Sequence, residues 1–233
     1  MQVFLGLDFD NDGNILLSPE ESRHCIKVLR RKKGEQIKVI DGKGNFYIAA
    51  LFDTNPEACK AKIISKEVVA ATKSYRLHIA ISPTKNPDRI EWMLEKCTEL
   101  GVDEFSFIVC KRTEKPTVKL ERLQKIAESA VKQSIQAVIP KINDAVSFKE
   151  FISAHKNTAT QKYIAYCGEE TKTDMKSILS EKDVLVLIGP EGDFTEEEIK
   201  LALGNGFTAL SLGETRLRTE TAGLFVAAGF KSY

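Results

Sequence analysis

A run of five bulky apolar residues at 184–188 stops abruptly at a Gly-Pro-Glu-Gly sequence, 189–192. Similar short apolar runs, several of them followed by helical patterns, lie at 76–82, 105–110, 162–167 and 207–212. Strands that are apolar on both faces and alternate with helices are typical of a parallel sheet covered on both sides. Residues 74–233 are therefore predicted to form an α/β domain with a parallel sheet.

Two helices of this domain have recognisable ends. Asp88 is expected to cap a helix that Gly101 terminates, and the apolar residues between them follow helical spacing. A longer helix is predicted from about Lys119 to Ala137, with Pro140 beyond it.

The first seventy residues have a different pattern. Short apolar segments predict strands at 15–17, 35–41, 45–52 and 59–65. Ser18-Pro19 predicts the start of one helix that ends near Gly34, and the Asp-Gly-Lys-Gly sequence at 41–44 predicts a hairpin turn. We expect a small β-barrel-like domain over 1–70, with a linker at 66–76 where the composition shifts.

Composition excludes several classes of protein. The five cysteines include no CxxC pair, the three histidines have no metal-ligand spacing, and no apolar run reaches membrane-spanning length. These features predict a cytoplasmic protein with free thiols, without a metal site and without a membrane partner. The formal net charge is +1, so any nucleic-acid surface has to come from local clusters of basic residues.

The loop at 189–192 follows a strand end, which is where open parallel sheets bind ligands. It lacks the glycine patterns of phosphate-binding loops, and Thr195 with Glu198 predicts a capping box for the next helix. Glu196 and Glu197 add negative charge that stabilises the helix dipole and repels phosphate. A ligand here is expected to be neutral or cationic, although this loop alone favours a tight turn without a ligand.

A second loop repeats the arrangement. The apolar run at 207–212 ends at Gly213, and an irregular segment with Arg216 and Arg218 follows. The last helix is apolar almost all round, as in helices buried in a core or in a subunit interface. Two adjacent strand ends are thus predicted to present glycine-marked loops to one region.

The pair IGPEGDFTEEEI (188–199) and LSLGETRLRTETA (210–222) resembles the two C-terminal motifs of the SPOUT methyltransferases, and among these the ribosomal RNA small subunit methyltransferase E family. Four further segments also match that family: HCIKVLRRKKGE, DGKG, LEKCTELGV and ERLQKIAESAVKQS. The resemblance therefore covers nearly the whole chain. It implies a PUA-like RNA-binding domain over 1–70 and a SPOUT methyltransferase domain over 74–233, threaded into a trefoil knot at about 184–230.

The resemblance also implies an activity. Members bind S-adenosylmethionine in the knot, form homodimers through this domain and methylate N3 of a uridine in 16S rRNA of the small ribosomal subunit. A sulfonium cation without phosphate is compatible with the acidic first loop. The alternatives are a SPOUT enzyme acting on tRNA and a non-catalytic RNA-binding or ribosome-assembly protein. The N-terminal module argues against the first alternative, and the intact 218–222 motif argues against the second.

The resemblance implies functional roles for those residues of this sequence that match the family's motifs. Cofactor binding is expected from Ile188, Gly189, Pro190, Glu191, Gly192, Leu212, Gly213, Leu217, Arg218, Glu220, Thr221 and Ala222. Arg218 is also predicted to be catalytic, because a guanidinium aimed at uracil oxygens stabilises the anion of N3. The alternative is a structural salt bridge of Arg218 with Glu220 or with the loop. RNA contacts are predicted for Arg30 and Arg112, and no general base is identified.

Three positions depart from the family pattern. Gln2 stands where a basic residue is common, and Gln136 replaces an arginine, so no RNA contact is carried over to it. Asp193 stands where a second glycine is common, and aspartate tolerates a left-handed backbone better than most residues.

Overall fold

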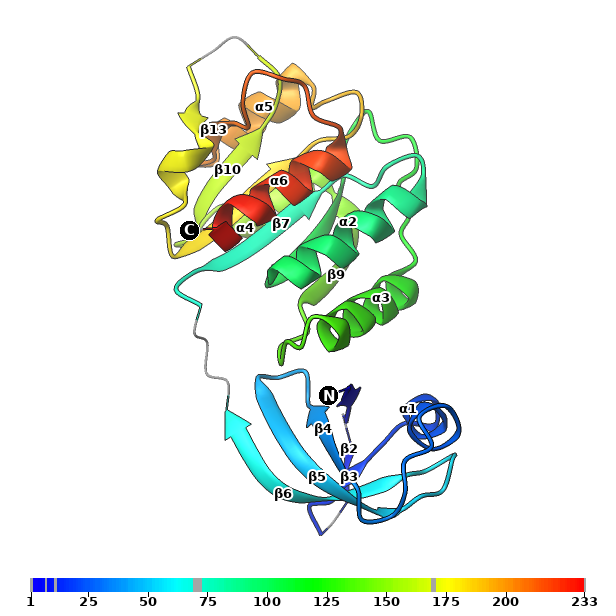
Figure 1. Ribbon diagram of the computed structural model, residues 1–233. Helices are drawn as coiled ribbons and strands as arrows, with labels where there is room; N and C mark the ends of the chain where they lie inside the picture. The colour runs from blue at the N-terminus through cyan, green and yellow to red at the C-terminus, as the bar shows by residue number, and fades with distance from the viewer. Residues whose placement is uncertain (1, 7, 11, 69–72, 169–170, 233) are drawn as a thin grey trace. The chain divides into compact units, whose positions relative to one another are not determined.

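The computed structural model describes residues 2–6, 8–10, 12–68, 73–168 and 171–232 (Figure 1). The chain divides into two compact units. The N-terminal unit comprises Met1–Thr72 with Glu128–Ile139, and the C-terminal unit comprises Lys73–Ala127 with Pro140–Tyr233.

The N-terminal unit is built on a mixed six-stranded sheet with the order β1-β4-β5-β6-β3-β2. Its strands are β1 (Val3–Leu5), β2 (Asp8–Phe9), β3 (Ile15–Leu16), β4 (Gln36–Ile40), β5 (Asn45–Asp53) and β6 (Lys60–Val68). β1 runs parallel to β4, and the other pairs are antiparallel. Val131 and Ala137 pack in one apolar cluster with side chains of β1, β4 and β5, which explains why 128–139 belongs to this unit.

The helix of this unit begins as predicted and ends early. Ser18 Oγ accepts a hydrogen bond from the Glu21 amide at 3.2 Å, and α1 (Pro19–Arg23) starts with proline. A π-helical turn, η1 (His24–Val28), follows, so the predicted end near Gly34 is wrong. Arg30 then adopts a left-handed backbone with φ 54°. Its exposed guanidinium has no ion pair or hydrogen bond with any residue that the structure describes.

The C-terminal unit contains a seven-stranded sheet with the order β11-β13-β10-β12-β7-β8-β9. Its strands are β7 (Arg76–Ile81), β8 (Glu104–Val109), β9 (Lys141–Ser147), β10 (Gln161–Ala165), β11 (Thr173–Asp174), β12 (Asp183–Ile188) and β13 (Thr208–Ser211). Every pair is parallel, which confirms the predicted sheet. The expected adjacency of β12 and β13 is wrong, because the crossover through the helix between them passes β10 and places that strand in the middle.

Helices cover both faces of this sheet (Figure 1). They are α2 (Pro87–Leu100), α4 (Phe148–His155), α5 (Glu196–Leu203) and α6 (Thr219–Ser232), with a short 3-10 turn η2 (Met175–Ile178). A further helix, α3 (Leu120–Gln133), has its first residues in this unit and its last residues, from Glu128, in the N-terminal unit. Leu185 and Leu187 pack with apolar residues of α4 and α5. α2 and α6 pack on each other over the opposite face, where α6 meets Ile81 at Gly223.

Two predicted helix ends need correction. Asn86, rather than Asp88, caps α2, because the Asn86 side chain accepts a hydrogen bond from the Asp88 amide at 3.1 Å. Gly101 ends α2 with φ 90°, as predicted. α3 ends at Gln133 rather than Ala137, since Ile135 takes a left-handed conformation with φ 55°.

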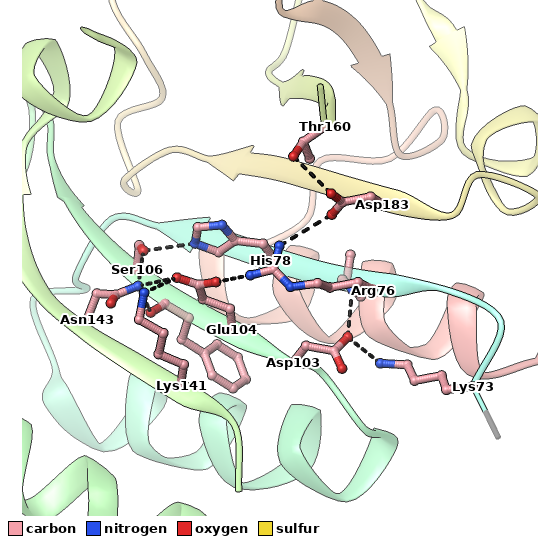
Figure 2. Close-up of polar contacts among 12 residues, drawn as sticks. Lys73, Arg76, His78, Asp103, Glu104, Ser106, Lys141, Asn143, Thr160 and Asp183 are labelled. Carbon is pink, nitrogen blue, oxygen red and sulfur yellow. Dashed lines mark hydrogen bonds and ion pairs between the residues drawn. The ribbon is translucent and has the colours of Figure 1, made fainter. Parts of the chain in front are cut away.

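A polar network joins the amino-terminal ends of β7, β8 and β9 (Figure 2). Glu104 accepts hydrogen bonds from Asn143 at 2.7 Å and from Lys141 at 3.0 Å, and it forms an ion pair with Arg76. His78 is buried, and its Nε2 lies 2.8 Å from Ser106 Oγ. These contacts tie neighbouring strands together at the edge of the sheet opposite the two motif loops.

Candidate functional site

A cavity of about 740 Å³ opens at the carboxyl ends of β10, β12 and β13. The predicted site residues that line it are Ile188, Gly189, Pro190, Glu191, Leu212, Gly213, Leu217, Arg218 and Ala222. Gly192, Glu220 and Thr221 are not among its lining residues. The two motif loops therefore meet around one cavity, although their strands are not neighbours.

The two loops are held together by direct hydrogen bonds. Thr219 Oγ1 donates to the Gly189 carbonyl at 3.0 Å, and this contact is buried. Arg216 Nη2 donates to the Glu191 carbonyl at 3.1 Å. Thr219, the first residue of α6, thus holds the end of β12 in place. Arg216 holds the loop that follows β12.

The third wall comes from the end of β10, a segment without any predicted site residue. Ala165, Tyr166, Cys167 and Gly168 all line the cavity. Lys172 Nζ donates to the carbonyls of Tyr166 at 2.7 Å and Gly168 at 2.8 Å, which shapes this segment. The sequence feature that points to this segment is another apolar run, 162–167, which ends before Gly168.

Asp193 stands where the family commonly has a second glycine, and its backbone and side chain both fit this position. Its backbone is left-handed, with φ 64°. Its Oδ2 accepts a hydrogen bond from the Cys167 amide at 2.8 Å, and its Oδ1 accepts one from the Phe194 amide at 2.8 Å. A glycine has no side chain for these contacts, so Asp193 joins the β12 loop to the β10 segment directly.

Gly192 faces Arg112 instead of the cavity. A Cβ atom at Gly192 would lie 3.2 Å from Arg112 Cδ, and Arg112 Nη1 donates to the Gly192 carbonyl at 2.7 Å. Arg112 therefore supports the first loop from outside. Its RNA contact stays a prediction.

The salt bridge between Arg218 and Glu220 is not formed. Glu220 is buried, and its Oε1 lies 3.7 Å from Arg89 Nε on α2. Within the described ranges, the Arg218 guanidinium has no hydrogen bond or ion pair, and it is exposed at the cavity. Arg218 is thus free to meet a ligand.

The predicted capping box of α5 is confirmed. Thr195 Oγ1 accepts from the Glu198 amide at 3.3 Å, and Glu198 Oε2 accepts from the Thr195 amide at 2.8 Å. Glu198 Oε1 also accepts from the Lys111 amide at 2.8 Å. Acidic side chains occupy this helix N-terminus, which disfavours a phosphate there.

Metal-binding clusters and membrane-spanning helices are both absent from the residues that the structure describes. These residues contain no group of three or more His, Cys, Asp or Glu side chains placed to hold a metal ion. They also contain no helix with the length and apolar character needed to cross a membrane.

Known proteins share this architecture. A family model of the RNA methyltransferase domain matches residues 71–231, and a model of the RNA methyltransferase PUA domain matches residues 17–64. The crystal structure of a probable rRNA-methyltransferase from Porphyromonas gingivalis has a TM-score of 0.89 and 38% identity, covering 98% of this chain and 96% of that one. The expected fold class, an α/β methyltransferase domain after a PUA-like domain, is confirmed.

Two relatives carry a more specific name. Ribosomal RNA small subunit methyltransferase E from Neisseria gonorrhoeae, in a crystal structure bound to S-adenosyl methionine, has a TM-score of 0.86 and 27% identity over 100% of this chain and 97% of that one. The protein of that name from Mesomycoplasma hyopneumoniae is 30% identical over 86% of this chain and 87% of its own length. The chain therefore belongs to the ribosomal RNA small subunit methyltransferase E family of RNA methyltransferases.

Proposed function

We propose that the protein is an S-adenosylmethionine-dependent methyltransferase that methylates N3 of a uridine in 16S rRNA. One observation carries the proposal: both motif loops of the family line a single cavity, which Arg218 also lines with a guanidinium that has no partner among the described residues. The names of the relatives refer to small subunit rRNA, which favours this reading over a tRNA enzyme. The 218–222 motif is intact, which favours it over a non-catalytic protein.

The residues of the cavity fit S-adenosylmethionine. The volume of about 740 Å³ lies within the roughly 300–1,000 Å³ typical of small-molecule sites. Gly213 has φ 113°, and a Cβ atom built there would meet nothing within 4 Å, so a ligand can approach this backbone closely. Ile188, Leu217 and Ala222 offer apolar surface. Glu191 adds a carboxylate to the lining, which is compatible with a cationic ligand.

The cofactor supplies a methyl group on a positively charged sulfur. The protein has to orient the uracil and favour the charge that develops when N3 loses its proton. Arg218 would serve this task, because the charge of the N3 anion spreads onto O2 and O4 and a planar guanidinium donates hydrogen bonds to such oxygens. Donors that are already in position at developing negative charge are the largest single contribution in many enzymes.

Several broader expectations form part of the proposal. Residues 1–70 would bind RNA through the PUA-like domain, with Arg30 on a phosphate, and Arg112 would make a second contact. Residues 74–233 would be the methyltransferase domain, knotted at about 184–230. Homodimerisation is supported by Trp92 on α2 and Phe225 on α6, two large apolar side chains that are 46% and 44% exposed. The protein would act in the cytoplasm on the small ribosomal subunit.

Cys167 provides a direct test of cofactor binding. It lines the cavity and is exposed, whereas the other four cysteines are buried. S-adenosylmethionine at ten times its Kd should slow alkylation of Cys167 by iodoacetamide roughly ten-fold, because about nine-tenths of the sites are then occupied. Peptide mass spectrometry measures the rate. Alkylation at the same rate with and without the cofactor would contradict this location of the site.

Asp193 should tune cofactor affinity without taking part in chemistry. Asp193→Gly keeps the left-handed backbone but removes both hydrogen bonds, so the β10 segment is no longer tied to the β12 loop. We expect the Kd for S-adenosylmethionine to rise about ten-fold, in line with about 1.5 kcal/mol for a hydrogen bond to a charged group. Calorimetry measures this value.

Asp193→Asn is the matched control for this prediction. Asparagine also tolerates the left-handed backbone and keeps an accepting oxygen, so its Kd should lie closer to that of the wild type. Equal affinities for the glycine variant and the wild type would remove Asp193 from this role.

A further inference from the structure

A second cavity, of about 200 Å³, lies in the C-terminal unit between the start of α2 and the segment that leads into α3. Its apolar lining comes from Pro83, Pro87, Ile90, Val118 and Leu123. The volume is below the roughly 300–1,000 Å³ typical of sites for whole small molecules. The cavity suits one flat ring system better than a complete cofactor.

This cavity shares an edge of the sheet with the large cavity. Pro83 follows β7 and the 115–118 segment follows β8, so both lie at the carboxyl ends of parallel strands. β7 is hydrogen-bonded to β12, and neighbouring strands lie about 5 Å apart. The Lys85 amide also donates to Glu191 Oε1 at 3.0 Å, which connects the loop after β7 to the loop of the large cavity. A strand with one nucleotide in the large cavity can therefore reach the second cavity with a nearby nucleotide.

One wall of the second cavity offers a flat surface for stacking. Glu91 and Arg122 form a two-point ion pair, with Oε1 to Nε at 2.6 Å and Oε2 to Nη2 at 2.6 Å. This pair holds the guanidinium plane in one orientation, although Arg122 itself is exposed. Single-stranded RNA is commonly bound by stacking of unpaired bases on aromatic rings and on guanidinium planes.

Three basic side chains, Lys115, Lys119 and Arg122, and two carboxylates, Asp88 and Glu91, line this cavity. Lys115 and Lys119 line the cavity and are exposed, and neither has a carboxylate partner in the described part of the chain. Ammonium groups at the mouth of a small apolar cavity match a nucleotide, whose base is flat and whose phosphate is anionic.

We propose that this second cavity binds one nucleobase of the RNA strand that carries the target uridine, with Lys115 and Lys119 on the adjoining phosphates. The inference rests on the proposed function, because it takes RNA as the substrate. It assigns to the α2–α3 region a role in substrate binding that is separate from the cofactor site.

Filter binding with 16S rRNA from a strain that lacks this gene tests the proposal. Thr117→Met extends an apolar chain from an exposed loop position into the cavity and offers no ring for stacking. We expect it to weaken rRNA binding roughly ten-fold, the effect of losing one base stack, with an unchanged salt dependence.

The double variant Lys115→Ala/Lys119→Ala should weaken binding and also reduce the salt dependence, because phosphate contacts are lost. Lys125→Ala, on the exposed side of α3, should bind as the wild type does.

Ultraviolet cross-linking gives a second readout that needs no turnover. A cross-linked nucleotide should appear on the peptide 113–119 in the wild type and should be lost in Thr117→Met, while the Kd for S-adenosylmethionine stays unchanged. Wild-type rRNA affinity in both cavity variants, or cross-links that avoid 113–119, would overturn the inference. A wild-type protein that binds rRNA but transfers no methyl group would contradict the proposed function and leave this test intact. Absence of rRNA binding by the wild type would overturn both.

Discussion

Replacing Arg218 with alanine is expected to lower the rate of methyl transfer to 16S rRNA by roughly 10²- to 10³-fold. This is the usual cost of removing one donor that stabilises developing negative charge. The guanidinium lies at the cavity and has no partner in the described residues, so its removal leaves no internal acceptor unpaired. The loss should therefore appear in kcat rather than in stability.

Two measurements separate this role from a structural one. The Arg218→Ala variant should keep the melting temperature and the oligomeric state of the wild type, and its affinity for S-adenosylmethionine should fall far less than its turnover. Arg218→Lys keeps the charge but not the planar fork, so it should recover only part of the rate. Turnover at the wild-type rate in the alanine variant would remove Arg218 from the mechanism.

Acid should destabilise the protein through His78 (Figure 2). Burial lowers the pKa of His78 to about 4, because the imidazolium is desolvated at this site. The unfolded chain binds a proton near pH 6.5 and the folded protein does not, so the free energy of unfolding falls as the pH drops from 6.5 toward 4. The expected loss between pH 7 and pH 5 is roughly 2 kcal/mol.

The matched variant is His78→Gln, which stays polar near Ser106 but does not titrate. Urea unfolding at pH 7 and pH 5 should show a pH dependence about 2 kcal/mol smaller in the variant than in the wild type. Burial acts to raise the pKa of Glu104, but the hydrogen bond from Asn143, the nearby His78 and the contact with Lys141 together lower it. Identical pH dependence in the two proteins would show that His78 does not carry the effect.

The sequence was sufficient to predict the elements whose patterns are local. Val184–Ile188 is apolar at every position because both faces of β12 are covered, and that pattern alone predicts a buried parallel strand. The capping box at Thr195 and the left-handed end of α2 at Gly101 also depend on a few adjacent residues. For the same reason the two motif loops could be recognised.

The remaining features depend on long-range contacts that no local pattern encodes. β10 lies between β12 and β13, so Cys167 enters the cavity from a segment that carries no family motif. β9 was not predicted, because this edge strand is mostly polar and partly exposed. Asp193 could be judged compatible with its turn, but its bond to the Cys167 amide follows only from the strand order.

Mass spectrometry of nucleosides from 16S rRNA tests the central claim most directly. A strain without this gene should lack one N3-methyluridine, and a plasmid copy of the wild-type gene should restore it, whereas the Arg218→Ala copy should not. Complete N3 methylation of 16S rRNA in the deletion strain would contradict the account.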